Sequence, residues 1–465
     1  MDTERIEAYR KSLSGKRILV VGMGKSGFAA VSVLHDLGAC VTVQDSKEYD
    51  SLDKGIKEYL EKAGIQGFFG KTPDKPSDFD IYVMSPGVPC DLDWIVEARE
   101  AGVEIIGELE LGYRITEGRY VAITGTNGKT TTTTLVGEIF KASGRKTSVV
   151  GNIGNAVVTS AIESSDEDWM VAEVSSFQLE TVKEFRPLVS AILNLTPDHL
   201  NRHKTMEAYG SAKAAIHANQ TADDYLVINY DDKACYKLAD GCKARLVPFS
   251  RKTKLDFGAY LDGEKLMLKD DNSEYLICER KDLQIIGDHN VENVLAGSAI
   301  AYFAGIGMDI ISQAVKDFPG VEHRIEYCGT IDGVKYYNDS KGTNVDAAII
   351  ALKALEKDIL LIAGGDGKAQ DFTELAKALK GRVKHLILLG RDAKDIEKCA
   401  VKEGFDSIYF CDTMETCVEK CAELAVAGDK VLLSPACASW DMYPNYEKRG
   451  EHFKNCVSAL NVTSN

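Results

Sequence analysis

The sequence predicts an α/β protein of three domains, each built on a mainly parallel sheet. Apolar, β-rich runs alternate with helix-length segments along nearly the whole chain, the pattern of strands joined by crossover helices. The length of 465 residues fits about three domains of ordinary size. Two glycine-rich loops each follow a predicted strand and begin a predicted helix. We expect domains at 1–107, 108–320 and 321–465, with boundaries near Gly107 and at Pro319-Gly320.

Short apolar runs bounded by turn residues mark the expected strands. In the first domain, a helix at 28–37 is expected between the first two strands. In the central domain, short alternating segments rich in Asp, Lys and Gly at 246–280 predict an inserted β-meander. The strands are expected at 17–22, 40–44 and 81–84, then at 120–124, 169–172 and 189–193, and finally at 359–363, 385–389, 407–411 and 431–434.

Composition excludes several classes of protein. The 55 basic against 71 acidic residues give a net charge of −16, which disfavours nucleic acid as a partner. No run of about eighteen apolar residues suggests a membrane span, and the acidic N-terminus lacks the layout of a signal peptide. The twelve cysteines form no C-x-x-C pairs, and Cys40, Cys278 and Cys411 lie in apolar runs, which favours reduced core cysteines. We expect a cytoplasmic, soluble protein without membrane or nucleic-acid partners.

The first glycine-rich loop has the sequence GMGKSG at 22–27, and Asp45 ends the next predicted strand. Glycines allow a pyrophosphate to approach the backbone, a helix N-terminus supplies N–H groups, and an acid in this position can bind a ribose. The pattern therefore favours a nucleotide diphosphate site, for which NAD is the common ligand. The alternative is a glycine turn that only packs the helix on the strand.

The second loop has the sequence TGTNGKTT at 124–131. It retains the G-x-x-G-K-T core of a phosphate-binding loop, although Ile123 stands where the full pattern has glycine. Backbone N–H groups would surround the phosphates, Lys129 would reach the terminal phosphates, and the Thr130 hydroxyl would bind Mg²⁺. A packing role does not explain this combination of residues.

Further polar residues follow the predicted strands. Glu173 and His199 each come just after a strand of the central domain, at the sheet edge where ligands collect in open α/β sheets. Taken singly, a surface Glu or a hydrogen-bonding His would be the simpler interpretation. The third domain has polar loops at 338–341, 364–368 and 434–439, which together suggest a face that binds carboxylates or phosphates.

Together these motifs resemble the Mur ligases, the ATP-dependent amino-acid-adding enzymes of peptidoglycan synthesis. The resemblance spans essentially the whole chain and includes the short phosphate-binding loop. It implies a Rossmann-like N-terminal domain that binds UDP rather than NAD, a P-loop ATPase-like central domain and a Rossmann-like C-terminal domain. The further matching segments are EVSSFQLE at 173–180, the pairs Asp198-His199, His289-Asn290 and His323-Arg324, Asn293, NDSK at 338–341, and GGDGK at 364–368.

Within the family, the single glycine loop, Ser85-Pro86-Gly87 and the segment SPACASWD at 434–441 resemble the branch that adds D-glutamate to UDP-N-acetylmuramoyl-L-alanine. The resemblance implies ATP and Mg²⁺ as cofactors, with one or two metal ions and Mn²⁺ as a substitute, and a monomer acting on small molecules. It assigns UDP-substrate binding to Ser26, Asp45, Ser46, Gly87 and Asn152, ATP binding to Gly125, Asn127, Gly128, Lys129, Thr130, Thr131, Asn293, Arg324 and Asp339, and amino-acid binding to Thr343, Lys368, Ser439 and Tyr446.

The resemblance also assigns the catalytic and metal sites. Lys129, Glu173, His199 and Lys213 would be catalytic, and Thr130, Glu173, His199 and a carbamate on Lys213 would hold metal. The sequence pattern alone predicts Lys213 as a surface residue of a helix, so its role comes from the resemblance only. Trp440 and Tyr446 depart from the family pattern, where Leu and Phe are frequent at these positions.

The implied reaction forms an amide bond through an acyl phosphate, with ADP and phosphate as products. Three alternatives remain: another ligase of the same superfamily that adds a different amino acid or extends folate with glutamate, an NAD-dependent oxidoreductase that uses the first glycine loop, and a non-catalytic nucleotide-binding regulator. The oxidoreductase would leave the second loop without a purpose. Turnover that depends on an amino acid would exclude the regulator.

Overall fold

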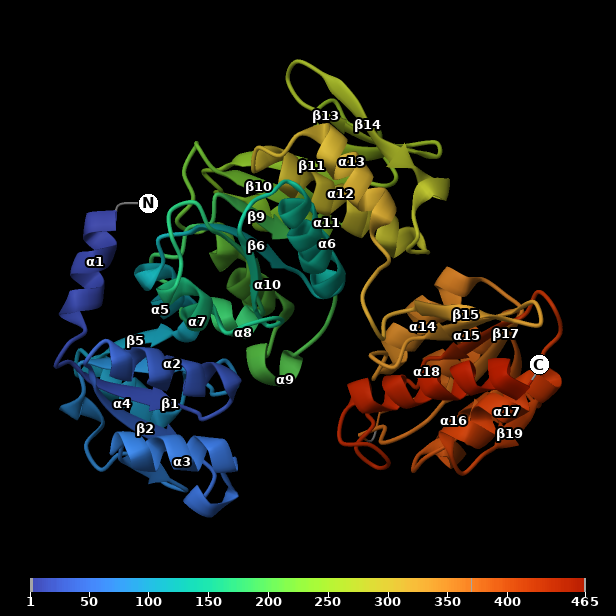
Figure 1. Ribbon diagram of the computed structural model, residues 1–465, viewed down its shortest axis with the longest axis horizontal. Helices are drawn as coiled ribbons and strands as arrows, with labels where there is room; N and C mark the ends of the chain where they lie inside the picture. The colour runs from blue at the N-terminus through green and yellow to red at the C-terminus, as the bar shows by residue number, and fades with distance from the viewer. Residues whose placement is uncertain (1–2, 369, 464–465) are drawn as a thin grey trace. The chain divides into compact units, whose positions relative to one another are not determined.

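The computed structural model describes residues 3–368 and 370–463. The chain forms two compact units, which we treat separately (Figure 1). The first unit runs through Leu283 and also holds His289–Phe318, and the second unit holds Gln284–Asp288 and the chain from Pro319 onward. Three sheets organise the molecule, two in the first unit and one in the second.

The N-terminal sheet is parallel throughout, with the strand order β3-β2-β1-β4-β5. Along β1, Ile18 and Val20 pack into one core cluster and Leu19 and Val21 into another, so both faces of the sheet are covered. The expected strands are confirmed, and the expected helix begins earlier, at Lys25, directly after the glycine loop. The elements are α1 (Thr3–Ser12), β1 (Arg17–Val21), α2 (Lys25–Asp36), β2 (Cys40–Asp45), α3 (Lys54–Ala63), β3 (Gly67–Phe69), β4 (Ile81–Met84), α4 (Asp93–Glu100) and β5 (Glu104–Gly107).

The central sheet has nine strands in the order β14-β13-β12-β11-β10-β9-β6-β8-β7. Its strands are parallel from β7 to β12, and β12, β13 and β14 form an antiparallel meander, which confirms the insertion expected at 246–280. The strands are β6 (Arg119–Thr124), β7 (Thr147–Gly151), β8 (Trp169–Glu173), β9 (Val189–Ile192), β10 (Tyr225–Asn229), β11 (Arg245–Ser250), β12 (Gly258–Asp262), β13 (Lys265–Lys269) and β14 (Glu274–Glu279). The helices are α5 (Glu108–Ile115), α6 (Lys129–Ala142), α7 (Val157–Ile162), α8 (Ser176–Leu179), α9 (Leu200–His203), α10 (Met206–Ala214), α11 (Lys233–Tyr236), α12 (Asp288–Phe303) and α13 (Met308–Asp317).

The third sheet has the order β15-β16-β20-β17-β18-β19. The four expected strands are confirmed, and the sequence pattern missed an antiparallel hairpin of β15 and β16, which adds two strands at one edge. Helices cover both faces, with separate core clusters on the two sides. The elements are β15 (Glu326–Ile331), β16 (Val334–Asn338), α14 (Val345–Leu355), β17 (Ile359–Ala363), α15 (Thr373–Leu379), β18 (Val383–Leu388), α16 (Ala393–Lys402), β19 (Ile408–Phe410), α17 (Met414–Leu424), β20 (Lys430–Leu433) and α18 (Tyr446–Thr463).

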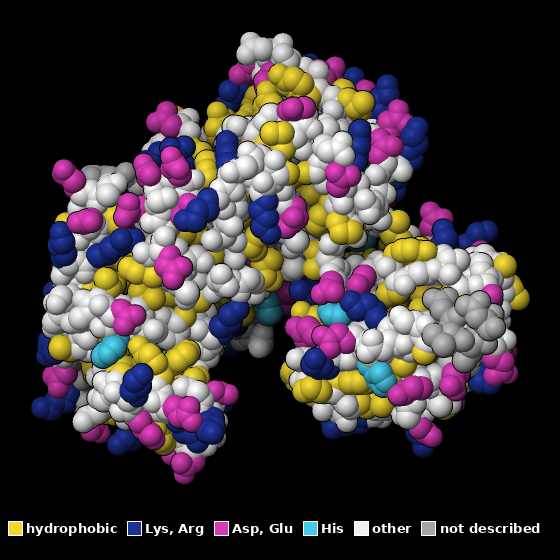
Figure 2. Space-filling model, in the orientation of Figure 1, with side chains coloured by type: hydrophobic (Ala, Val, Ile, Leu, Met, Phe, Trp, Pro, Cys, Tyr) yellow, Lys and Arg dark blue, Asp and Glu magenta, His cyan; other side chains and the backbone are white. Residues whose placement is uncertain are grey.

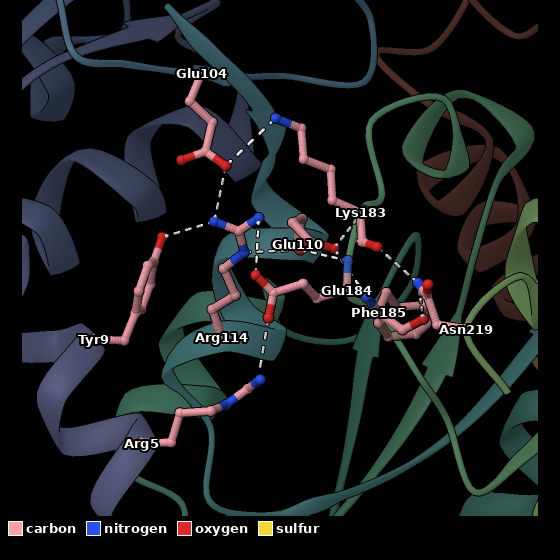
Figure 3. Close-up of polar contacts among 9 residues, drawn as sticks. All are labelled: Arg5, Tyr9, Glu104, Glu110, Arg114, Lys183, Glu184, Phe185 and Asn219. Carbon is pink, nitrogen blue, oxygen red and sulfur yellow. Dashed lines mark hydrogen bonds and ion pairs between the residues drawn. The ribbon is translucent and has the colours of Figure 1, made fainter. Parts of the chain in front are cut away.

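A buried polar network joins the two sheets of the first unit (Figure 3). Glu110 on α5 is fully buried, and its carboxylate accepts hydrogen bonds from the backbone N–H groups of residues 183–185 at 2.9–3.1 Å. Arg114, one turn later, donates to Glu110 at 2.8 Å and to Glu104 of β5 at 3.0 Å. Because Glu110 joins the backbone of residues 183–185 to α5 and Arg114 joins α5 to Glu104 of β5, the network holds the N-terminal sheet to the central one.

The predicted roles of the cysteines are only partly confirmed. All twelve are free thiols. Cys278 is buried in the core as expected, but Cys40 is exposed because it begins β2, where the strand has not yet entered the core. Cys411 is half-buried, at the end of β19.

Charged side chains of both signs share the surface that can be seen. In Figure 2, acidic and basic side chains are interspersed over both units. Among the residues that the structure describes, no helix is long and apolar enough to cross a bilayer.

Candidate functional site

The loop between β6 and α6 has the backbone geometry of a phosphate-binding loop. Gly125 and Gly128 both have positive φ, at 152° and 82°, which side chains other than glycine rarely adopt. Gly128 caps α6, and Lys129 is the first residue of that helix. The N-terminal N–H groups of α6 therefore face the loop, where an anion is stabilised.

Two lysines converge on this loop. The ammonium of Lys129 donates to the carbonyl oxygens of Gly125 and Thr126, each at 2.8 Å. The ammonium of Lys213, which comes from α10, donates to the same Gly125 carbonyl at 2.8 Å. Two lysine side chains on one carbonyl place several N–H donors at the end of β6, which suits a polyanion there.

Lys213 is almost fully buried, at 1% exposure, so the surface position predicted from the helix pattern is wrong. The reason is tertiary: α10 packs beneath the loop, and the ammonium lies 4.4 Å from the ring of Tyr209. Burial, together with the charge of Lys129, lowers the pKa of Lys213 to about 7. A large fraction of this amine is therefore neutral near pH 7, and the neutral amine is the form that reacts with CO₂ to give a carbamate.

Glu173 ends β8, directly beside the loop. It pairs in register with Ile123 of β6 and is 1% exposed. Its Oε1 accepts a hydrogen bond from the amide of Asn152 at 2.7 Å, while its buried Oε2 has no hydrogen-bond partner among the described residues. A buried carboxylate oxygen without a donor fits a divalent cation.

His199 lies on the other side of the loop, after β9. It has a positive φ of 53°, and its half-exposed ring lies 4.9 Å from the ring of Phe177 and 6.4 Å from that of Tyr209. The Thr126 hydroxyl donates to the Thr196 carbonyl at 3.1 Å, so the segment that holds His199 contacts the phosphate-binding loop. Since β9 and β8 flank β6 in the sheet, the segments that follow all three strands meet at one edge, as the sequence predicted.

Asn194, which sequence analysis missed, fixes the loop. Its side-chain oxygen accepts hydrogen bonds from the backbone N–H groups of Thr126 and Asn127, at 3.0 and 2.8 Å, and its amide donates to the Asn127 carbonyl. Its position two residues after β9, opposite a glycine loop on the neighbouring strand, is the only signal that would have identified it.

Asn293 of α12 packs against the start of α6. Its side-chain oxygen accepts from the Thr132 hydroxyl at 3.3 Å, and its amide donates to Asn290 at 3.0 Å. A Cβ atom on Gly128 would lie 2.2 Å from the Asn293 oxygen, so only glycine fits at position 128. This contact places α12 beside the loop.

The first glycine loop is held by its own protein partners. The carboxylate of Asp45, at the end of β2, accepts from the backbone N–H groups of Met23 and Lys47 at 2.7 and 2.8 Å. The Ser85 hydroxyl donates to the Gly22 carbonyl at 2.8 Å. Of the other UDP-site candidates, Ser26 is half-buried in the first turn of α2, and Ser46 and Gly87 are exposed after β2 and β4.

Asn152 belongs to the turn after β7, and Lys25 of the first glycine loop donates to the Gly154 carbonyl of the same turn. This contact brings the first glycine loop close to a residue that bonds Glu173. The candidates for the UDP-linked substrate and for ATP thus meet within the first unit.

The remaining candidates belong to the second unit. The three polar loops of its sheet follow β16, β20 and β17, which are neighbours, so they meet at one edge as the sequence predicted. Asp339 is buried there; its carboxylate accepts from the Ser434 hydroxyl at 2.6 Å and from the Ile325 N–H at 3.3 Å. Burial raises the pKa of Asp339 to about 7. The Nε atom of Arg324 is buried without a hydrogen-bond partner among the described residues.

The amino-acid candidates surround this edge. Lys368 has a positive φ of 52°, and its ammonium lies 4.2 Å from the ring centre of Trp440, which is 64% exposed. Ser439 is buried, and Tyr446 begins α18 with the Lys341 ammonium 5.6 Å from its ring. Thr343 donates its N–H to the Lys341 carbonyl.

Arg449, also missed from the sequence, ties two of these loops together. It is buried on α18 and donates to the Ser340 hydroxyl and carbonyl and to the Cys437 carbonyl, at 2.8–3.1 Å. Burial lowers its pKa to about 10. Nothing in the sequence distinguishes it from the other charged residues of this helix.

The donor set of the first unit fits ATP and Mg²⁺. A loop with glycine at 125 and 128, at a helix N-terminus and with two lysines, suits phosphates. The Oε2 atom of Glu173, which has no hydrogen-bond partner among the described residues, suits a hard cation near the threonines that begin α6. The neutral amine of Lys213 suits carbamate formation, which would add an anionic ligand at the same place.

The chain matches three family models in sequence order. Residues 16–107 match the Mur ligase MurD-like N-terminal domain, residues 123–301 the Mur ligase middle domain, and residues 323–437 the Mur ligase glutamate ligase domain. The prediction of three α/β domains is confirmed by these matches and by the three sheets.

Curated relatives extend over nearly the whole chain. A UDP-N-acetylmuramoylalanine–D-glutamate ligase of Thermoanaerobacter pseudethanolicus is 49% identical, covering 96% of this chain and 99% of the relative. An enzyme of the same name from Clostridioides difficile is 46% identical over the same shares of both chains.

Solved structures share the fold. UDP-N-acetylmuramate-alanine ligase from Thermotoga maritima superposes with a TM-score of 0.58 at 22% identity, over 96% of this chain and 99% of that one. MurF from Acinetobacter baumannii gives a TM-score of 0.59 at 15% identity, over 96% and 92%.

Proposed function

This chain belongs to the Mur ligase family, and on that premise we propose that it adds D-glutamate to UDP-N-acetylmuramoyl-L-alanine at the expense of ATP. The MurD-like N-terminal domain and the names of relatives 46–49% identical support this choice of substrates. The observation that carries the chemistry is the convergence of Lys129 and Lys213 on the Gly125 carbonyl, beside the unpartnered Glu173 oxygen.

The proposed reaction has two steps. The carboxylate of the UDP-linked substrate attacks the γ-phosphorus of ATP, so that a P–O bond to ADP breaks and an acyl phosphate forms. The neutral amine of D-glutamate then attacks the acyl carbonyl, and the resulting tetrahedral intermediate expels phosphate to leave an amide. No protein nucleophile is needed, so positioning and charge neutralisation account for catalysis.

The phosphate-binding loop would hold ATP in the first step. The ammonium of Lys129, which donates to two loop carbonyls, would turn away from them to reach the terminal phosphates. Mg²⁺ would neutralise phosphate charge, held by Thr130, Glu173, His199 and a carbamate on Lys213, as one ion or two, and Mn²⁺ would substitute. The other ATP residues would be Gly125, Asn127, Gly128, Thr131 and Asn293 in the first unit and Arg324 and Asp339 in the second.

The two other substrates would bind at separate sheet edges. The UDP-linked substrate would contact Ser26, Asp45, Ser46, Gly87 and Asn152, and D-glutamate would contact Thr343, Lys368, Ser439 and Tyr446. Asp45 already bonds two backbone N–H groups of its own chain, so its main effect would be to hold the loop in shape. Lys368 would pair with a carboxylate of the amino acid.

We assign one substrate to each domain, with limits at 1–107, 108–320 and 321–465. At the first boundary, the buried network of Glu110 supports a tight connection between the two domains. Near the second boundary, Pro319 begins the longer part of the second unit. We further propose a monomer that acts in the cytoplasm, where its ATP and UDP-linked substrates would be found.

The experiment that tests this function measures ADP release from the purified full chain. With ATP, Mg²⁺ and UDP-N-acetylmuramoyl-L-alanine present, we expect turnover only after D-glutamate is added, and little with L-glutamate, L-lysine or glycine. Turnover with another amino acid, or with a folate acceptor, would assign the chain to a different branch. ADP release independent of any amino acid would contradict a ligase.

A further inference from the structure

A cluster of metal-ligating side chains lies in the second unit, between α17 and α18. Atoms of Glu415, His452 and Cys456 that can each bind a metal lie within 4.8 Å of one another. Glu415 is in the first turn of α17, while His452 and Cys456 are four residues apart on α18 and therefore share one face of that helix. None of the three is among the residues proposed above to bind substrate, ATP or Mg²⁺.

The histidine is oriented as a metal ligand would be. Its Nε2 lies 2.8 Å from Glu415 Oε1, and its Nδ1 lies 2.8 Å from the Tyr443 hydroxyl. A metal-bound imidazole commonly keeps its second nitrogen on a fixed hydrogen-bond partner, which sets the tautomer and the ring plane. Because a carboxylate oxygen only accepts, Nε2–H donates to Glu415 in the metal-free chain and the Tyr443 hydroxyl donates to Nδ1. A shift of the ring proton to Nδ1, where the Tyr443 oxygen can accept it, frees the Nε2 lone pair for a metal in the space shared with Glu415.

Several cysteines lie around this cluster of ligands. The core cluster beneath α17 and α18 contains Cys417 and Cys421, with Cys328, Cys411 and Cys456 packed against it, so five of the twelve cysteines lie on one side of this sheet. Among them, Cys456 is half-buried and comes from the same helix face as His452.

We propose that Glu415, His452 and Cys456 bind a divalent transition-metal cation of the zinc class. One carboxylate oxygen, one imidazole nitrogen and one thiolate are typical zinc ligands, whereas Mg²⁺ and Ca²⁺ prefer oxygen alone. A tetrahedral zinc shell with bonds of about 2.0–2.3 Å separates its ligand atoms by roughly 3.3–3.8 Å, so small side-chain rotations complete it. Water takes the fourth position, since Glu415 is exposed.

Binding releases one proton to solvent and takes up one cation. The thiol proton of Cys456 leaves, the ring proton of His452 moves from Nε2 to Nδ1, where the Tyr443 oxygen accepts it, and bonds form from the metal to Nε2, to the carboxylate oxygen and to the thiolate. The metal joins α18 to α17 and fixes the C-terminal helix on its sheet.

The test uses Co²⁺ as a spectroscopic probe of the full chain, after chelator and reductant treatment and without nucleotide. We expect a thiolate-to-cobalt charge-transfer band in the near ultraviolet together with the intense visible bands of tetrahedral Co²⁺, both removed by Zn²⁺. Cys456→Ser should abolish the charge-transfer band, His452→Ala should weaken binding at least about 10-fold, and Tyr443→Phe should weaken it less, by up to about 10-fold. Absence of the band in the unmodified chain would overturn the proposal.

Two controls separate this site from others. Cys399→Ser alters a half-buried thiol on α16 outside the cluster, and Lys129→Ala alters the phosphate-binding loop; both variants should retain the band. A band that survives Cys456→Ser would place the metal elsewhere and overturn the proposal. Because a variant can lose binding by misfolding, the unmodified chain is also alkylated with and without Zn²⁺: Zn²⁺ should protect Cys456 selectively, and equal labelling would count against the site.

Discussion

Two loops of the first unit have the same backbone architecture but are surrounded by different charged side chains. Each joins the end of a buried parallel strand to a helix, β1 to α2 and β6 to α6, and each turns on a glycine with positive φ. In the first loop, the nearby acid, Asp45, is fully engaged by backbone N–H groups, and Lys25 reaches away to the Gly154 carbonyl. In the second, Lys129 and Lys213 share one carbonyl beside a Glu173 oxygen that has no donor within the described part of the chain.

The comparison teaches that a glycine loop at a helix N-terminus specifies anion binding and little more. What the anion undergoes depends on the charges that the neighbouring strands and helices bring to the loop. In the proposed function, the first loop would hold a diphosphate without activating it, because Asp45 and Lys25 are bonded to protein groups. The second gathers the Lys129 ammonium, the Lys213 amine and the carboxylate of Glu173, groups that would hold phosphates and a divalent cation for phosphoryl transfer.

The largest difference between the two loops is expected when the lysine of each loop is replaced by alanine. Lys129→Ala should reduce ADP formation by about 1,000-fold or more, because the loop loses the positive charge that would stabilise the transferring phosphate. Lys25→Ala, the matched control, should leave kcat near that of the unmodified chain and act only on the KM for the UDP-linked substrate. Steady-state ADP release measures both variants.

Equal losses of kcat in the two lysine variants would contradict the division of roles. Circular dichroism of each variant checks that the fold persists. A Lys129→Ala protein with near-normal turnover would remove the assignment of the second loop altogether.

A smaller effect is expected at the second lysine of the β6–α6 loop. Lys213→Ala should lower kcat by about 100-fold, because a carbamate on this buried amine would add a metal-binding anion. A short carboxylic acid such as acetate should restore part of the activity by occupying the vacated space, and it should not rescue Lys129→Ala. Retention of full activity by Lys213→Ala, or equal rescue of both variants, would show that no carbamate is involved.

The smallest effect concerns stability where the first loop meets the central domain. Glu108 on α5 is buried; its Oε1 accepts from the Val158 N–H, and its Oε2 has no partner among the described residues. Burial raises the pKa of Glu108 to about 7, with the backbone N–H groups of α7 and the charge of Lys25 opposing the shift. The folded chain thus holds this proton more tightly than the unfolded chain, in which the pKa is about 4.3.

The sign of the pH effect follows from this difference. The contribution of Glu108 is complete below about pH 4.3 and is lost as the pH rises through 7, a change on the order of 3 kcal/mol for a group this buried. Glu108→Gln, which mimics the protonated side chain, should therefore lose less of its Tm between pH 5 and 8 than the unmodified chain does. Parallel Tm profiles would show that Glu108 does not titrate in this range.

The elements that determine the fold are largely local and could be predicted from the sequence. Strand β1 is an apolar run followed by a glycine. The eight residues 124–131 contain both the lysine of the phosphate-binding loop and the start of α6. The hairpin of β15 and β16 was missed because apolar and polar residues alternate only weakly along its strands. In addition, the neighbour of β16 in the sheet, β20, lies about a hundred residues later in the chain.

The site was less predictable wherever a residue acts through tertiary contacts. Lys213 is indistinguishable from a surface lysine until α10 packs under the loop, and Arg449 reaches two loops from the first turn of a charged helix. Asn194 is one of many polar residues after a strand, and only the register of β9 beside β6 places it against the loop backbone. Short-range patterns contain no information on such contacts.

The most direct test of the central claim follows an oxygen atom. The UDP-linked substrate is prepared with ¹⁸O in both oxygens of its terminal carboxylate and is turned over with ATP and D-glutamate. If the β6–α6 loop transfers the γ-phosphate to this carboxylate, one ¹⁸O atom must appear in each phosphate released and the other must remain in the amide. Phosphate free of ¹⁸O, with product still formed, would contradict the account.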